Sequence, residues 1–72
     1  MATTTIEKKM RYVSQDMASA VRRKRGELKL SQVQLAEAMG VSRMTLRKAE
    51  AGDTVLYPDI FSKVEHWLMA QI

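Results

Sequence analysis

The sequence predicts an all-α domain, a compact bundle of four to five helices. Alanine, leucine, methionine, lysine, arginine and glutamate are frequent, and runs that alternate apolar with polar residues, as strands do, are absent. The single proline, Pro58, and the three glycines, Gly26, Gly40 and Gly52, mark the points where helices are expected to stop. Between these points apolar residues recur at steps of three and four, which is the helical period.

Length and composition limit the possible functions. The chain has 72 residues, enough for one domain with a marginal core. It has no cysteine and one histidine, His66, so disulfides, thiolate zinc sites and other metal clusters are not expected, nor is a cofactor. Self-association is the remaining common way to stabilise so small a domain. The net charge of +4 suits a polyanionic partner.

The N-terminal third carries one apolar stripe. Its members are Ile6, Met10, Val13, Met17 and Val21. Thr4 and Glu7 have the spacing of a capping box, so we expect one long helix over about residues 5–25. A break near residues 14–16 is the alternative, because Ser14 and Asp16 can each cap a new helix.

We divide the chain into a partly helical N-terminal extension, residues 1–15, and a functional domain, residues 16–72. The N-terminus lacks the apolar segment of a signal peptide, and no run approaches the roughly eighteen apolar residues of a membrane span. We therefore expect a cytoplasmic protein with no membrane partner.

Two capped helices follow in close succession. Ser31 and Gln34 have the spacing of a capping box, and Gly40 provides a stop. Ser42 is a second N-cap, for a helix that ends at about Ala51. A capped helix, a turn of about three residues and a second capped helix form a helix-turn-helix.

The segment after Gly52 reads as a loop over residues 53–58, followed by a last helix. Asp59 is the expected N-cap of that helix. Its apolar face is broad for so small a domain and comprises Ile60, Phe61, Val64, Trp67, Leu68 and Ile72.

The second helix of the motif carries the functional signal. At about 100° per residue, its cations and one methionine share about 140° of the helix surface. They are Arg43, Met44, Arg47 and Lys48. Leu46 and Ala49 lie opposite, and Glu50 also lies on the inward side. Arginine and lysine can bond guanine and methionine can touch a thymine methyl, so this face suits the major groove. A cationic face is often only a solvated one, but the capped helix and turn before it favour DNA reading.

The segment LSQVQLAEAMGVSRMTLRKAEAG, residues 30–52, resembles the phage repressor and Cro-like helix-turn-helix domain of the Xre family. It has the Leu-Ser/Thr-Gln, Leu-Ala, Gly-Val-Ser and Glu-x-Gly landmarks at their usual spacing, and the resemblance covers about residues 16–68. It implies a lambda-repressor-like bundle. It also implies a sequence-specific transcriptional regulator, with repression as the default, that reads a palindromic operator in double-stranded DNA as a homodimer.

The resemblance also implies roles for individual residues. The base-reading set is Arg43, Met44, Arg47 and Lys48, of which Arg47 flanks the bases or contacts the backbone. Gln32 is expected to contact a base or a phosphate, and Ser42 and Thr45 to contact phosphates. Many relatives carry glutamine near the start of this helix where Arg43 and Met44 stand here. Their operator preference therefore does not transfer.

Two structural roles complete the prediction. Arg25 and Glu50 align with a family ion pair that ties the first helix to the end of the reading helix; two separately solvated charges are the alternative. The proposed dimer interface lies on the last helix and comprises Phe61, Val64, Trp67, Leu68 and Ile72. The alternative is that these residues close the core of one subunit, as some of them must.

Other function classes fit less well. An enzyme is not expected, because the chain has no phosphate-binding glycine loop, no cysteine and no recognisable carboxylate pair. The competing interpretation is a protein-interaction module, such as an antitoxin or anti-repressor that masks a toxin or another protein. Its affinity would be insensitive to the charges of Arg43, Arg47 and Lys48. We expect a regulator that belongs to a phage, a plasmid or a toxin–antitoxin system.

Overall fold

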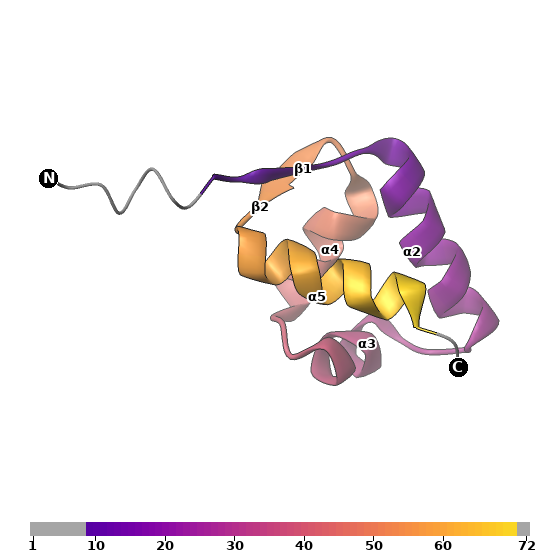
Figure 1. Ribbon diagram of the computed structural model, residues 1–72. Helices are drawn as coiled ribbons and strands as arrows, with labels where there is room; N and C mark the ends of the chain where they lie inside the picture. Colours follow the sequence, from indigo (N-terminus) through magenta and orange to yellow (C-terminus); the bar gives the residue numbers. More distant parts are fainter. Residues whose placement is uncertain (1–8, 71–72) are drawn as a thin grey trace, which may run out of the picture.

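The computed structural model describes residues 9–70, and this part of the chain forms four helices and one two-stranded sheet (Figure 1). In chain order the elements are β1 (Arg11–Val13), α2 (Gln15–Glu27), α3 (Gln32–Met39), α4 (Arg43–Ala51), β2 (Thr54–Leu56) and α5 (Pro58–Met69). The predicted helical architecture is confirmed with four helices. No fifth helix occurs within residues 9–70, and the sheet was not expected.

The N-terminal segment differs from the prediction. Residues 11–13, expected to be helical, form β1, which pairs antiparallel with β2 and sets Tyr12 opposite Val55. Helix α2 begins only at Gln15, and its N-cap Ser14 accepts a hydrogen bond from the Met17 amide at 3.1 Å. The break near Ser14 is therefore the correct alternative. A pairing between residues more than forty positions apart leaves no local periodicity in the sequence. The apolar stripe therefore predicted a helix where a strand forms. The Thr4–Glu7 capping box lies outside the described residues.

The segment before α5 also differs. Residues 54–56, expected as loop, form β2. Helix α5 starts at Pro58 with Tyr57 at the N-cap position, whereas Asp59 lies in the first turn instead of capping it. Proline suits the first helical position because its φ is preset and its missing N–H would have no partner there.

The helix-turn-helix has the caps that the sequence predicts. Ser31 Oγ accepts from the Gln34 amide at 3.0 Å, and Gln34 Oε1 accepts from the Ser31 amide at 2.8 Å. Gly40 ends α3 with φ 76°, a left-handed conformation that suits glycine. Ser42 Oγ then accepts from the Thr45 amide at 3.1 Å and starts α4. Two residues, Val41 and Ser42, separate the Gly40 stop from α4.

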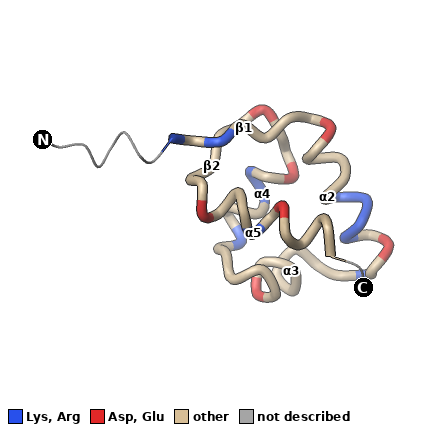
Figure 2. Tube along the Cα trace, in the orientation of Figure 1, with Lys and Arg blue, Asp and Glu red and all other residues tan. Residues whose placement is uncertain are grey.

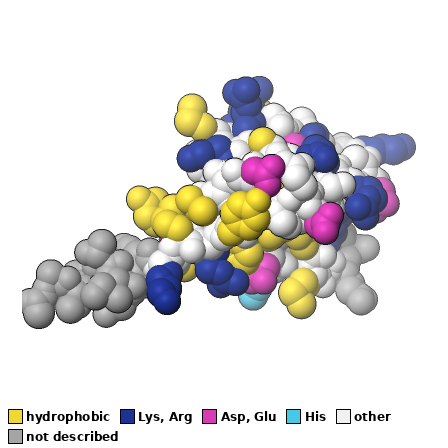
Figure 3. Space-filling model, turned by 90° about the horizontal axis from the view of Figure 1, so that it is seen from above, with side chains coloured by type: hydrophobic (Ala, Val, Ile, Leu, Met, Phe, Trp, Pro, Cys, Tyr) yellow, Lys and Arg dark blue, Asp and Glu magenta, His cyan; other side chains and the backbone are white. Residues whose placement is uncertain are grey.

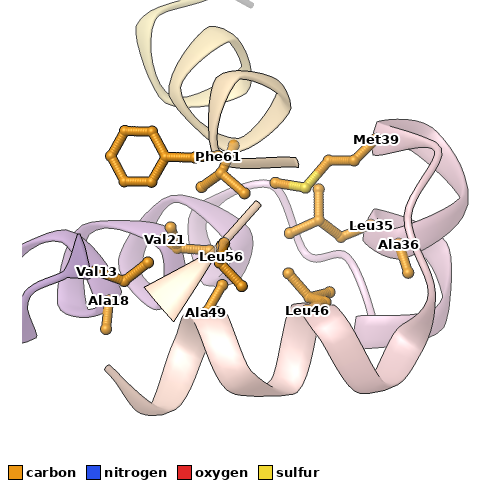
Figure 4. Close-up of a cluster of buried hydrophobic side chains, with 11 residues drawn as sticks. Val13, Ala18, Val21, Leu35, Ala36, Met39, Leu46, Ala49, Leu56 and Phe61 are labelled. Atoms are coloured by element: carbon orange, nitrogen blue, oxygen red, sulfur yellow. The ribbon is translucent and has the colours of Figure 1, made fainter. Parts of the chain in front are cut away.

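The core lies where the helices meet (Figure 4). Val21 from α2, Leu35 from α3 and Leu46 from α4 are fully buried. Strands β1 and β2 add Val13 and Leu56, so the sheet closes one side of the core. Consequently α4 packs along one face against α2, α3 and β2, and its opposite face is exposed to solvent.

The C-terminal end of α5 is anchored to α2 by one lysine. Lys24 Nζ donates to the carbonyls of Trp67 at 2.5 Å and Ala70 at 2.8 Å, and it lies 4.9 Å from the centre of the Trp67 ring. A cation at a helix C-terminus satisfies carbonyls that have no partner within the helix and complements the helix dipole. None of the helices within residues 9–70 has the length and apolar character needed to cross a membrane.

Candidate nucleic-acid interface

The outward face of α4 carries the predicted reading residues. Arg43, Met44, Arg47 and Lys48 are all exposed, and Met44 has 71% of its surface accessible. Leu46 and Ala49, on the opposite face, are fully buried. Figure 2 shows where lysine and arginine lie along the trace, with α4 among the cationic elements. The helix therefore presents three cations and a flexible apolar side chain without an acid among them.

The start of α4 is built around two hydroxyls. Ser42 Oγ caps the helix and donates to Thr45 Oγ1 at 2.9 Å. This bond leaves the hydroxyl hydrogen of Thr45 for another acceptor. Ser42 is exposed and Thr45 half-buried. A helix N-terminus favours an anion, because the N–H groups and the helix dipole point toward it.

The first residue of α3, Gln32, is half-buried and already has a protein partner. Its Nε2 donates to Glu50 Oε1 at 3.0 Å. The bond uses one of the two N–H groups of the amide, so the second remains for an external acceptor. The sequence predicted an external contact for Gln32 but gave no signal for this internal one.

Arg25 and Glu50 form a two-point ion pair. Arg25 Nε lies 2.6 Å from Glu50 Oε2, and Arg25 Nη2 donates to Oε1 at 3.0 Å. Glu50 is only 5% exposed, and Arg25 also donates to the carbonyl of Leu30 at 3.1 Å. Together with Gln32, the pair joins α2 and the start of α3 to the end of α4.

Most side chains of the basic run at residues 22–25 already have hydrogen-bond partners within the protein. Arg22 donates to the carbonyl of Glu50, Lys24 holds α5, and Arg25 holds Glu50. Arg23 remains exposed, as does Lys29 beyond the helix. Residues 22 and 25 are three apart and share the side of α2 that meets α4, a spacing that signals a common face.

A family model described as helix-turn-helix, of the Cro type with Xre-like members, matches residues 21–66. The chain belongs to this helix-turn-helix family. Its members are DNA-binding domains of transcriptional regulators. No curated protein and no solved structure matches the chain significantly. The matched residues run from α2 into α5 and leave β1 and residues 15–20 of α2 outside.

The residues predicted for a dimer interface differ in how deeply the structure buries them. Phe61 and Val64 are 6% and 1% exposed and belong to the core of the subunit. Trp67 and Leu68 are half-buried against that core, and Ile72 lies outside the described residues. On this helix, Trp67 and Leu68 are therefore the predicted interface residues that keep some accessible surface.

Sequence reasoning missed the outer face of the sheet. Strand alternation puts Val13 and Leu56 inside and leaves a patch of exposed apolar residues outside (Figure 3). The patch comprises Met10, Tyr12, Val55 and Tyr57. The sequence carried little signal for it, because the strands Arg11–Val13 and Thr54–Leu56 are only three residues long and do not alternate apolar with polar residues. Within residues 9–70, no three His, Cys, Asp or Glu residues are grouped so as to hold a metal ion.

Proposed function

We propose that the protein is a sequence-specific regulator of transcription that inserts α4 into the major groove of double-stranded DNA. The observation that carries the proposal is the division of α4 into a fully buried apolar face and an exposed face with three cations, one methionine and no acid. Repression, by occupying a promoter, is the mode that needs no further part of the protein.

The exposed side chains divide by chemistry. Arg43 and Lys48 have donors for guanine, Arg47 flanks them, and Met44 suits a thymine methyl. Contacts to phosphates set the register of the protein on DNA without reading sequence. Ser42 and Thr45 at the start of α4 suit this role, and so does the remaining N–H group of Gln32.

We further propose that the regulator binds a palindromic operator as a homodimer. Two-fold dimers of this kind present their reading helices to successive major grooves about 34 Å apart. Trp67 and Leu68 on α5 are the proposed contacts, because they are only half-buried. Phe61 and Val64 hold α5 in place beneath them.

Selection from random duplex DNA, followed by titration of the selected site, tests this function. Arg43→Ala and Lys48→Ala are each expected to cost about 1–3 kcal/mol in binding and to relax base preference at one position. Lys29→Ala is the matched control, since it removes the same charge from an exposed position outside α4. It is expected to change affinity, if at all, equally for all sequences.

Two results would refute the proposal. One is selection that enriches no sequence. The other is weak binding that disappears with salt for wild type and every variant alike, because such binding reflects only phosphate attraction.

The outer face of the sheet favours a second candidate, an antitoxin or anti-repressor that masks another protein. Met10, Tyr12, Val55 and Tyr57 expose between 42% and 59% of their surface on this one face. Exposed apolar patches of this kind mark interaction surfaces. Under this candidate, Tyr12→Ser abolishes association with the partner protein, while Lys48→Ala leaves that association unchanged. If Lys48→Ala abolishes the association and Tyr12→Ser does not, the second candidate is rejected.

A further inference from the structure

The last turn of α4 is held by side chains that come from α2, one from its first residue and one from its middle. Gln15 Nε2 donates to the carbonyl of Ala51 at 2.9 Å and to Asp53 Oδ2 at 2.9 Å. Arg22 donates to the carbonyl of Glu50. The last carbonyls of a helix have no partner within it and commonly bond water. Here two of them bond α2, so the end of α4 is tied to a neighbouring helix.

Strand β1 reinforces this attachment through Asp53. The Asp53 amide donates to the carbonyl of Val13 at 2.8 Å, and Tyr12 donates its hydroxyl to Asp53 Oδ1 at 2.5 Å. Asp53 has φ 52°, in the left-handed region, where aspartate is one of the better tolerated residues. Asp53, two residues after the end of the helix, is thus fixed by three separate hydrogen bonds.

The space between Gln15 and α4 is closely filled. Gly52 has φ 78°, and a Cβ there would lie 2.7 Å from Gln15 Nε2 and 3.1 Å from the Cβ of Ala18. Only glycine therefore lets the chain leave α4 so close to α2. Tyr12 and Gln15 both precede residue 21, where the family match begins, so the match does not cover this attachment.

We propose that Gln15 is a positioning residue for DNA reading, which acts with Tyr12 through Ala51 and Asp53 to fix the direction of the last turn of α4. The proposal rests on the function proposed above. Lys48 and Arg47 lie within one turn of the fixed end, whereas Arg43 lies at the opposite end beside the Ser42 cap. Loss of the attachment therefore changes base reading mainly at the positions contacted by Lys48 and Arg47.

The test compares three variants on DNA that differs from the selected site by single base pairs. Gln15→Ala removes both bonds to the end of α4, and Tyr12→Phe removes only the hydroxyl that holds Asp53. Ser14→Ala is the matched control, because it removes the N-cap of the same helix without a bond to α4. Binding is measured well below the melting temperature of each variant, so that every sample is folded.

We expect Gln15→Ala to reduce discrimination at the positions read by Lys48 about three- to tenfold, and Tyr12→Phe to reduce it less. Discrimination at the positions read by Arg43 stays as in wild type. Amide exchange of Gly52 and Asp53 accelerates in both variants. Ser14→Ala lowers thermal stability but leaves the ranking of DNA sequences unchanged.

A merely structural role would lower affinity for all sequences by one common factor, since it changes only the fraction of active protein. That result, or a Gln15→Ala variant whose ranking equals that of Ser14→Ala, overturns the positioning role. Lys48→Ala, made in the otherwise wild-type protein, is the separate check on the underlying function. If Lys48→Ala in wild type has no effect on base preference, DNA reading by α4 has failed, whatever the Gln15 variants do.

Discussion

Gln32 donates a hydrogen bond from its side-chain amide to Glu50 Oε1 at 3.0 Å, so the first residue of α3 is joined to the last turn of α4. The same carboxylate receives Arg25 through both of its oxygens. One buried glutamate thus bonds side chains from both α3 and α2 to the last turn of α4. Loss of Glu50 should therefore be costly although the residue is not part of the apolar core.

Glu50→Ala is expected to destabilise the protein by about 3–5 kcal/mol, because it leaves the partly buried Arg25 guanidinium without its counter-charge. Urea unfolding measures the change. Glu37→Ala is the matched control: it makes the same chemical change at an exposed position on α3 and should shift stability by less than about 0.5 kcal/mol. Equal effects of the two variants would show that the ion pair does not contribute.

The two faces of α4 should contribute separately to stability and to the proposed recognition of DNA. Leu46 is fully buried, so Leu46→Ala should cost about 2–5 kcal/mol of unfolding free energy. Met44 is 71% exposed, so Met44→Ala should leave stability within about 0.5 kcal/mol of wild type and weaken preference for one thymine. Thermal melts and binding to the selected site measure both quantities. A large loss of stability in Met44→Ala would contradict the assignment of its face.

The Tyr12–Asp53 contact predicts a response to acid. Hydrogen bonds from Tyr12 and then Gln15 hold the pKa of Asp53 below its ordinary value of 3.8. A lowered pKa in the folded state adds stability that is present above the unfolded pKa and is lost as the pH falls through the folded one. The same contact raises the pKa of Tyr12 above 10.0, so its contribution is lost only at higher pH, as the pH rises through that raised value.

Urea midpoints of wild type and Asp53→Asn measure this response. The stability difference between them should be constant near neutral pH and should narrow below pH 3.8, where the carboxylate becomes protonated. Asparagine is a suitable replacement because it also tolerates the left-handed backbone of residue 53. A difference that stays the same down to pH 2 would mean that the carboxylate contributes no folded-state hydrogen bond.

Two glycines should respond in opposite directions to the same substitution. Gly26 lies within α2, and a Cβ there would meet nothing within 4 Å, so Gly26→Ala should stabilise the protein by about 0.5–1 kcal/mol. Gly40 has φ 76°, so Gly40→Ala should destabilise it by about 1–2 kcal/mol. Melting temperatures give both signs. A stabilising Gly40→Ala would show that the turn of the motif is not left-handed in solution.

Local chemistry explains which parts of the fold were predictable. Ser31, Gln34, Gly40 and Ser42 act on backbone groups within four residues of themselves, so the bounds of α3 and α4 follow from the sequence. The sheet does not follow, because Tyr12 and Val55 gain their hydrogen-bonded strands only when distant segments meet. Asp59 was a wrong N-cap because the preset φ of Pro58 starts the helix two residues earlier, with Tyr57 at the N-cap position.

The candidate site was predictable to a similar extent. The outward face of α4 follows from the helical period, and the structure exposes the side chains that the period placed there. The partners of those side chains do not follow. Arg22 and Lys24 belong to a run of four cations, and only the packing of α2 against α4 and α5 shows that they bond carbonyls of the protein. Gln15 carried no recognisable signal.

Strands β1 and β2 flank the helix-turn-helix along the chain, and their pairing has a consequence for folding kinetics. Contacts within α2, α3 and α4 join residues that are close in sequence, whereas the sheet joins residue 11 to residue 56 and must close a long loop. The strands should therefore associate after the helices form during refolding and should separate before the motif opens during native-state fluctuations. Within residues 9–70, proteolysis of the native protein should then begin at the sheet, before the motif itself opens.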